Sequence, residues 1–176
     1  MDSSIDEIKE LVKSCLNELY RLDEELFRRN RGKGVSERSI VFRFAHYLQN
    51  RIGSDFFVDC DFNSSKEGEE GTGGKPILNQ DRTKTKRFID VIVHKRELNN
   101  DNNLVCFEFK KWNNTNRKEI EKDRNNLHKL TLKQGKFGYS YGFHITIHKV
   151  KSESKWTIYE NGDPIQPEQE KIIFGN

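Results

Sequence analysis

The sequence predicts an α/β fold, a three-layer sandwich in which helices flank a mixed central β-sheet, with an extra long helix at the N-terminus. Three observations lead to this class: two amphipathic helical segments precede residue 53, alternating apolar runs follow between residues 56 and 160, and one helical segment separates two of those runs. At 176 residues, with twelve Phe and a hydrophobic share of 33%, the chain is long enough for a single domain spanning 1–176.

The N-terminal segment, residues 1–31, predicts a long helix. Ser4 and Glu7 form a capping box that marks its start, and the pattern continues to about Asn30. Apolar side chains repeat along it at spacings of three and four: Ile5, Ile8, Val12, Cys15, Leu19, Leu22 and Leu26. This seam must be buried, and two interpretations stay open. It packs against the domain's own helices, or it forms a homodimer interface, since about three heptads suffice for a recognisable coiled coil.

The α/β core is expected between residues 35 and 160. Ser36 is a good N-cap for a second helix that runs to about Ile52, with an apolar face of Ile40, Val41, Phe44, Leu48 and Ile52. Residues 56–62 predict a first strand, and the Gly-, Ser- and Glu-rich residues 63–82 predict a mobile loop. Residues 116–133 predict a crossover helix, and residues 137–150 and 155–160 two further strands. The tail from Pro164 gives no clear signal.

The centre of the core is a predicted hairpin between Lys86 and Trp112. Two β-branched and aromatic runs flank the polar loop ELNNDNN. Because side chains alternate along a strand, Glu108 and Lys110 share one face of the second run. A loop centred near Asn100 sets Asp90 opposite Lys110 and diagonal to Glu108, so two carboxylates and an ammonium converge on one patch. A register slip of one residue would move the two sets to opposite faces.

The residue types in this patch indicate a metal site. Two neighbouring carboxylates repel each other and favour a cation, and Mg²⁺ takes oxygen ligands. A lysine beside them can orient a metal-bound water or stabilise charge that develops on a phosphate. Glu37 lies on the apolar face of the second helix, where a carboxylate wants a partner or a metal. Equally, Glu37 can interact with the N-terminal end of the helix macrodipole.

The order Asp90, spacer, Glu108-x-Lys110 on adjacent strands resembles the PD-(D/E)xK nuclease superfamily, which has the restriction-endonuclease-like fold. The resemblance covers about residues 35–150, and Ile89 stands where the family usually has Pro. It implies a Mg²⁺-dependent (or Mn²⁺-dependent) nuclease that hydrolyses phosphodiester bonds, foremost a DNA endonuclease.

The same resemblance implies a role for each residue. Asp90, Glu108 and the carbonyl of Phe109 would be metal ligands, Lys110 would position the attacking water, and Glu37 would be an outer or second-metal ligand. Two other functions stay open. The chain could be a nucleic-acid- or protein-binding module that keeps the nuclease fold without turnover, its charged residues forming a salt-bridged patch on the sheet. It could also be an assembly subunit that pairs with a larger effector through its N-terminal helix.

Basic residues occur in runs, although the net charge is only +3. The expected phosphate contacts are Lys84, Lys86, Arg87 and Lys111, and Arg28, Arg29, Arg31 and Lys33 form a further run. The alternative for each run is a solvated face. Lys110 and Lys111 form a third run, and three runs near one carboxylate site favour nucleic acid, foremost DNA, as the partner.

Cysteine and hydropathy patterns predict a cytoplasmic protein. Cys15, Cys60 and Cys106 have no CxxC spacing and are expected to be reduced core residues. We expect no membrane span and no signal peptide. His144 and His148 flank Thr146 in one predicted strand, a pattern more typical of a polar sheet face than of a zinc site.

Overall fold

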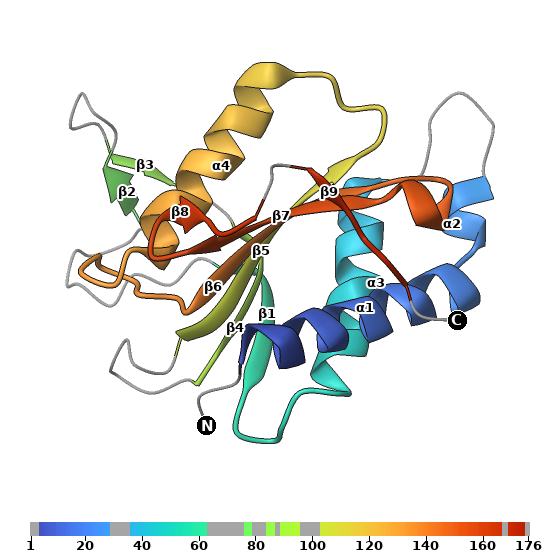
Figure 1. The fold of residues 1–176 in the computed structure, drawn as a ribbon, viewed down its shortest axis with the longest axis horizontal. Helices are drawn as coiled ribbons and strands as arrows, with labels where there is room; N and C mark the ends of the chain where they lie inside the picture. The colour runs from blue at the N-terminus through green and yellow to red at the C-terminus, as the bar shows by residue number, and fades with distance from the viewer. Residues whose placement is uncertain are drawn as a thin grey trace.

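A seven-stranded, mostly antiparallel β-sheet with helices on both faces forms the protein (Figure 1). The computed structural model describes residues 4–28, 36–62, 76–78, 84–86, 89–95, 103–166 and 169–174, with the backbone alone at 62, 76–78 and 84–86. The helices are α1 (Ile5–Leu22), α2 (Glu25–Arg28), α3 (Glu37–Gln49) and α4 (Arg117–Thr131). The strands are β1 (Phe57–Phe62), β2 (Pro76–Leu78), β3 (Lys84–Lys86), β4 (Ile89–His94), β5 (Asn103–Lys111), β6 (Tyr141–Ile147), β7 (Lys155–Glu160), β8 (Asp163–Pro164) and β9 (Glu170–Lys171).

The sheet has the order β1-β4-β5-β6-β7-β8, and β9 also pairs with β7. Only β5 and β6 run parallel among these pairs, and α4 is the crossover between them. A parallel pair needs a long connection, so the helix that the sequence places between two strands accounts for the mixed sheet. The α/β class is confirmed.

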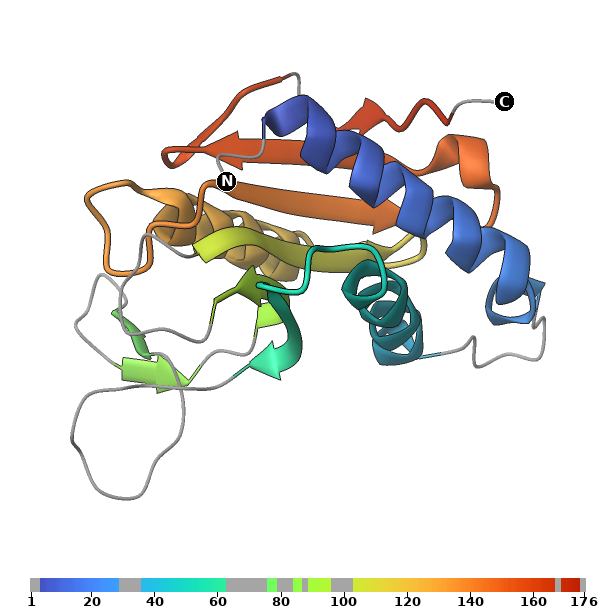
Figure 2. The same cartoon turned by 90° about the horizontal axis from the view of Figure 1, so that it is seen from below.

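Two layers of helices enclose the sheet (Figure 2). Helices α1 and α3 pack on the face that carries Val91, Phe107, Phe143 and Trp156. Aromatic rings join the layers there, because Phe44 of α3 lies 5.3 Å from Phe107 between ring centroids. Helix α4 covers the opposite face and contributes Leu127 and Leu130 to a smaller cluster.

The N-terminal helix is shorter than predicted. Its capping box is confirmed, since the Ser4 hydroxyl accepts from the Glu7 N–H and the Glu7 carboxylate accepts from the Ser4 N–H. The helix ends at Leu22 instead of near Asn30. Asp23 turns the chain there, and both of its carboxylate oxygens lie 2.9 Å from Nε of Arg43 on α3. A tertiary ion pair therefore interrupts a locally favourable helical pattern.

The apolar seam of α1 is buried within the chain. Cys15 and Leu19 have no exposed surface, while Leu22 at the end of the helix is 51% exposed. The seam packs into the cluster formed with α3 and the sheet, which is the internal-packing alternative. A homodimer stays a prediction, and it would need a surface other than these side chains.

Three smaller predictions change with the structure. Cys60 is exposed, so it is not a core residue, whereas Cys15 and Cys106 are buried free thiols as expected. Part of the predicted loop is ordered as β2, which pairs with β3, and residues 63–75 and 79–82 lie outside the described residues. The tail supplies β8 and β9 on one edge of the sheet. None of the helices in the described ranges combines the length and apolar character that a bilayer span requires.

Candidate active site

The ionisable side chains of the predicted hairpin lie on the sheet face under α4. The register between β4 and β5 differs from the predicted one. The β4/β5 ladder pairs Val91 with Phe107 and shifts at a bulge between Val93 and His94. Extending this register by one residue sets Asp90 opposite Glu108, instead of opposite Lys110. The prediction is wrong by two residues because β4 already ends at His94 and β5 already begins at Asn103, which moves the centre of the pairing to a lower residue number. A shift of two preserves the face, so Asp90, Glu108 and Lys110 still lie on one side.

Asp90 lies where β4 and β5 separate. Its Oδ2 accepts a 2.7 Å hydrogen bond from the Phe109 N–H, so a side chain replaces the next backbone partner in the ladder. Burial raises the pKa of Asp90 to about 6. The Phe109 N–H and the Lys110 charge oppose this rise, whereas Glu37 and Asp123 add to it. The carboxyl group thus titrates close to neutral pH.

Glu108 is almost completely buried between β5 and α4, with 3% of its surface exposed. Its Oε1 accepts a 3.0 Å hydrogen bond from the side-chain amide of Asn126. Burial raises the pKa of Glu108 well above its ordinary value, and repulsion by Asp90 and Asp123 raises it further. A nearby cation would lower this pKa and favour the ionised carboxylate.

Lys110 lies at the centre of the cluster and contacts groups from α3, α4 and β5. Its Nζ lies 2.6 Å from Oδ2 of Asp123 and 3.6 Å from Oε1 of Glu37, and it donates a 3.0 Å hydrogen bond to the Phe109 carbonyl. Burial lowers the pKa of Lys110, but the hydrogen bond and charge of Asp123 outweigh it, so the pKa lies above the ordinary value. The Lys110 ammonium is therefore held in its charged form by the carboxylates beside it.

Glu37 reaches the cluster from the first turn of α3. Its Oε2 accepts a 2.9 Å hydrogen bond from the Lys111 N–H, while Oε1 faces Lys110. Ser36 precedes the helix as predicted, although its hydroxyl makes no capping hydrogen bond. The carboxylate thus stands both at a helix N-terminus and beside the cluster, so the two roles considered for it are compatible.

Two members of the cluster, Asp123 and Asn126, come from α4 and were not predicted. They share the inner face of the helix with Leu127 and Leu130, and all four are buried. Helical spacing is the signal that could have found them, because Asp123 follows the inward-facing Ile120 by three residues. A carboxylate and an amide on a core-facing stripe are exceptions to the usual pattern, and such exceptions are candidates for function.

His144 is the third side chain that the sequence did not assign to the site. It lies on β6 beside Glu108 in the parallel register and has no exposed surface. Neither ring nitrogen has a hydrogen-bond partner within the described part of the protein. Burial lowers the pKa of His144 to about 4, with Arg124 and Lys110 adding to the shift. A buried neutral imidazole without partners is costly, so this end of the sheet is not arranged for stability alone.

The predicted phosphate-contacting residues fall in different places. Lys111 adjoins the cluster, with its Nζ 5.2 Å from the ring centroid of Trp112. Lys84 and Lys86 lie on β3, which pairs with β2 in a separate two-stranded sheet. Arg87 lies outside the described residues, as do Arg29, Arg31 and Lys33 of the further basic run. Lys111 is thus the one member of this set whose side chain is described.

The donor chemistry of the cluster fits a hard divalent cation. Asp90 and Glu108 offer carboxylate oxygens that repel each other, and Phe109 offers a carbonyl oxygen nearby. Across the described ranges, no group of three or more His, Cys, Asp or Glu side chains is arranged to hold a metal. Mg²⁺ is commonly bound through one or two carboxylates while it keeps several waters, so a pair of carboxylates is sufficient for it.

No protein-family model, curated protein or solved structure matches the chain. The geometry of the cluster and the order of the elements therefore carry the functional conclusion.

Proposed function

We propose that this protein is a Mg²⁺-dependent nuclease that hydrolyses phosphodiester bonds of DNA. The observation that carries the proposal is the cluster around Lys110 under α4, where the carboxyl groups of Asp90, Glu108 and Asp123 outnumber its one ammonium. Such a group is costly to fold, so a purely structural role explains it poorly. A metal-binding role explains the excess negative charge, because the carboxylates would hold a divalent cation, Mg²⁺ or Mn²⁺.

The order of the elements supports the same proposal. From α3 onward, the main sheet adds three antiparallel strands, then the α4 crossover, then a strand parallel to β5. This is the core order of the restriction-endonuclease-like fold, with α1 as the added N-terminal helix. We propose that fold for the chain.

Each residue then has a defined task. Asp90, Glu108 and the Phe109 carbonyl would hold the cation, which would lower the pKa of bound water and polarise the phosphate. The Phe109 N–H orients Asp90, and Asn126 orients Glu108. Asp123 and Glu37 hold the Lys110 ammonium, which can donate to the attacking water or to a phosphate oxygen as its charge grows.

A second function is favoured by one observation. The 2.6 Å contact between Lys110 and Asp123 is a closed ion pair, which also suits a binding module that keeps the nuclease fold without turnover. The two functions differ in whether the cluster takes up metal and cuts DNA.

Plasmid cleavage separates them. Supercoiled DNA incubated with the protein should be nicked or linearised with Mg²⁺ or Mn²⁺, and EDTA should prevent it. Asp90→Asn and Glu108→Gln preserve shape but remove a charge, so both should abolish cleavage. Asp163→Asn is the matched control, because Asp163 is exposed on β8. A folded protein that leaves the plasmid intact under all metal conditions would contradict the nuclease proposal.

Lys110→Ala separates metal binding from chemistry. It should lower the cleavage rate by about two to three orders of magnitude, the usual effect of losing one preorganised electrostatic group. Calorimetric titration with Mn²⁺ should still show uptake by this variant, and weakened uptake by Asp90→Asn. Loss of Mn²⁺ binding in Lys110→Ala would instead mean that the ammonium organises the ligands.

A further inference from the structure

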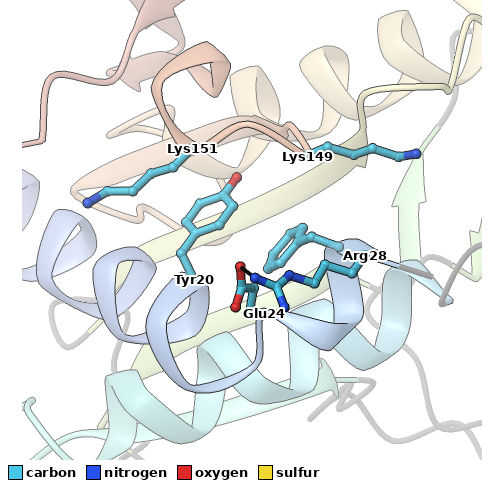
Figure 3. Close-up of a pocket in the computed structure, with 6 residues that line it drawn as sticks. Tyr20, Glu24, Arg28, Lys149 and Lys151 are labelled. Carbon is cyan, nitrogen blue, oxygen red and sulfur yellow. Dashed lines mark ion pairs between the residues drawn. The ribbon is translucent and has the colours of Figure 1, made fainter. Parts of the chain in front are cut away.

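A basic cavity lies at the same end of the sheet as the candidate active site, but on the face that α1 and α3 cover. It has a volume of about 550 Å³ and is lined by Tyr20, Glu24, Phe27, Arg28, Lys149 and Lys151 (Figure 3). Three of these side chains are cationic and one is anionic, and Arg28 forms an ion pair with Glu24. The cavity therefore keeps an excess of positive charge, which suits an anionic ligand.

The wall that carries the lysines is held in place by Tyr20. Its hydroxyl donates a 2.6 Å hydrogen bond to the His148 carbonyl and lies 2.7 Å from the Ser154 hydroxyl. The Ser154 hydroxyl in turn accepts a 2.9 Å hydrogen bond from the His148 N–H. These contacts fix both ends of the turn from 148 to 154, so Lys149 and Lys151 project from a supported backbone and would bind a ligand with less loss of entropy.

Aromatic rings contact the lysine ammonium groups on either side of the cavity. Nζ of Lys149 lies 5.5 Å from the ring centroid of Trp112, and Nζ of Lys151 lies 4.6 Å from that of Phe174. In Figure 3 the side chains of Lys149 and Lys151 extend to opposite sides of Tyr20. An aromatic face attracts an ammonium without neutralising its charge, so these groups keep their attraction for phosphate oxygens.

Trp112 links the cavity to the candidate active site. Nζ of Lys111 lies 5.2 Å from its ring centroid, so Lys111 of β5 and Lys149 of the turn after β6 contact the same indole. The Trp112 N–H donates a 2.9 Å hydrogen bond to the Ile147 carbonyl, which places Trp112 at the ends of β5 and β6. The preceding residues, Lys110 and Lys111, are the ones that Glu37 contacts. Cations thus continue from the cluster to the cavity.

We propose that the surface formed by Lys111, Trp112, Lys149, Lys151 and Arg28 binds the phosphodiester backbone of DNA on one side of the cleavage position. This inference rests on the proposed nuclease function and extends it to a substrate-holding surface. Lysine ammoniums contact phosphates without reading bases, so the surface contributes affinity that is independent of sequence and depends on salt.

The test is fluorescence anisotropy with a fluorescein-labelled DNA duplex, in EDTA to prevent cleavage, over a series of KCl concentrations. We compare the full-length protein with the double variant Lys149→Ala/Lys151→Ala. Each lost phosphate contact should flatten the plot of log K against log salt by about one unit, so the variant should lose about two units of slope as well as affinity. Lys133→Ala is the control, since Lys133 is exposed beyond the opposite end of α4.

The outcomes separate this inference from the proposed function. If the double variant and Lys133→Ala both bind DNA with the slope of the unmodified protein, the surface inference is wrong, even if the protein cuts plasmid DNA. An unmodified protein that fails to bind the duplex would also overturn it. If only the double variant loses slope while no metal supports cleavage, the DNA surface stands and the nuclease proposal fails.

Discussion

The two faces of the central sheet bury different kinds of side chain. Under α1 and α3 the inward side chains of β4 to β7 are all hydrophobic: Val91, Val93, Val105, Phe107, Phe109, Phe143, Ile145, Ile147, Trp156 and Ile158. Under α4 the face changes along its length. Ile92, Cys106 and Tyr159 pack with α4 at one end, whereas Asp90, Glu108, Lys110 and His144 occupy the other.

This difference separates the source of stability from the candidate site. Each large hydrophobic side chain on the first face stabilises the fold by about 1.5–3 kcal/mol through burial. The ionisable end of the second face opposes folding, because its carboxyl groups are taken from water with few compensating cations. Positions that weaken a fold and are nevertheless built into its interior are where function is expected.

The largest expected effect tests the first face. Leu19→Glu places a carboxylate at a position with no exposed surface and should cost more than about 4 kcal/mol, enough to unfold the protein. Leu22→Glu is the matched control on the same helix, because Leu22 is 51% exposed, and it should change stability by less than about 0.5 kcal/mol. Circular dichroism melting curves measure both. A Leu19→Glu variant that folds but changes its oligomeric state would support a dimer interface instead.

An intermediate effect tests the ionisable end of the second face through pH. The pKa of Asp90 is raised from 3.8 to about 6, so the folded state holds its proton where the unfolded state has lost it. Stability should therefore fall as pH rises from about 4 to 6, by about 3 kcal/mol for this group. Asn cannot ionise, so Asp90→Asn should be more stable than the unmodified protein above pH 6.

Urea denaturation at a series of pH values measures this difference, with Asp163→Asn as the control. The two stability curves should converge below about pH 4, where Asp90 is protonated in both states. If Asp90→Asn is instead less stable at pH 7, attraction by Lys110 outweighs burial and the pKa of Asp90 lies below its ordinary value.

The smallest expected effect concerns His144 on the same face. His144→Leu removes two buried ring nitrogens that have no partner among the described residues, so it should stabilise the protein by about 1–3 kcal/mol. His128→Leu is the contrast, because the Nδ1 of His128 contacts the Gly162 carbonyl and its loss should destabilise. Thermal unfolding in EDTA compares them. A His144→Leu variant that loses stability would show that its imidazole has a partner in solution.

Local periodicity was sufficient to predict much of the site. Alternation along two strands placed Asp90, Glu108 and Lys110 on one face, and helical spacing turned Glu37 toward the core. These inferences depend on side-chain direction within one element, which the sequence encodes residue by residue. The capping box of α1, the crossover helix and the limits of β7 follow from equally local signals.

Tertiary structure decided what depends on the meeting of separate elements. The register of β4 against β5 depends on where each strand begins and ends. The register predicted from the loop length alone therefore differs from the observed one by two residues. Asp123, Asn126 and His144 join the cluster because α4 and β6 pack beside β5. Helix α1 ends at Leu22 because Arg43 of α3 attracts the carboxylate of the next residue, Asp23, in a part-buried ion pair. Interactions between residues far apart in sequence leave no periodic signal. The sequence alone therefore determined the helices and strands and the sheet face on which Asp90, Glu108 and Lys110 lie. Tertiary packing determined which other side chains meet them there.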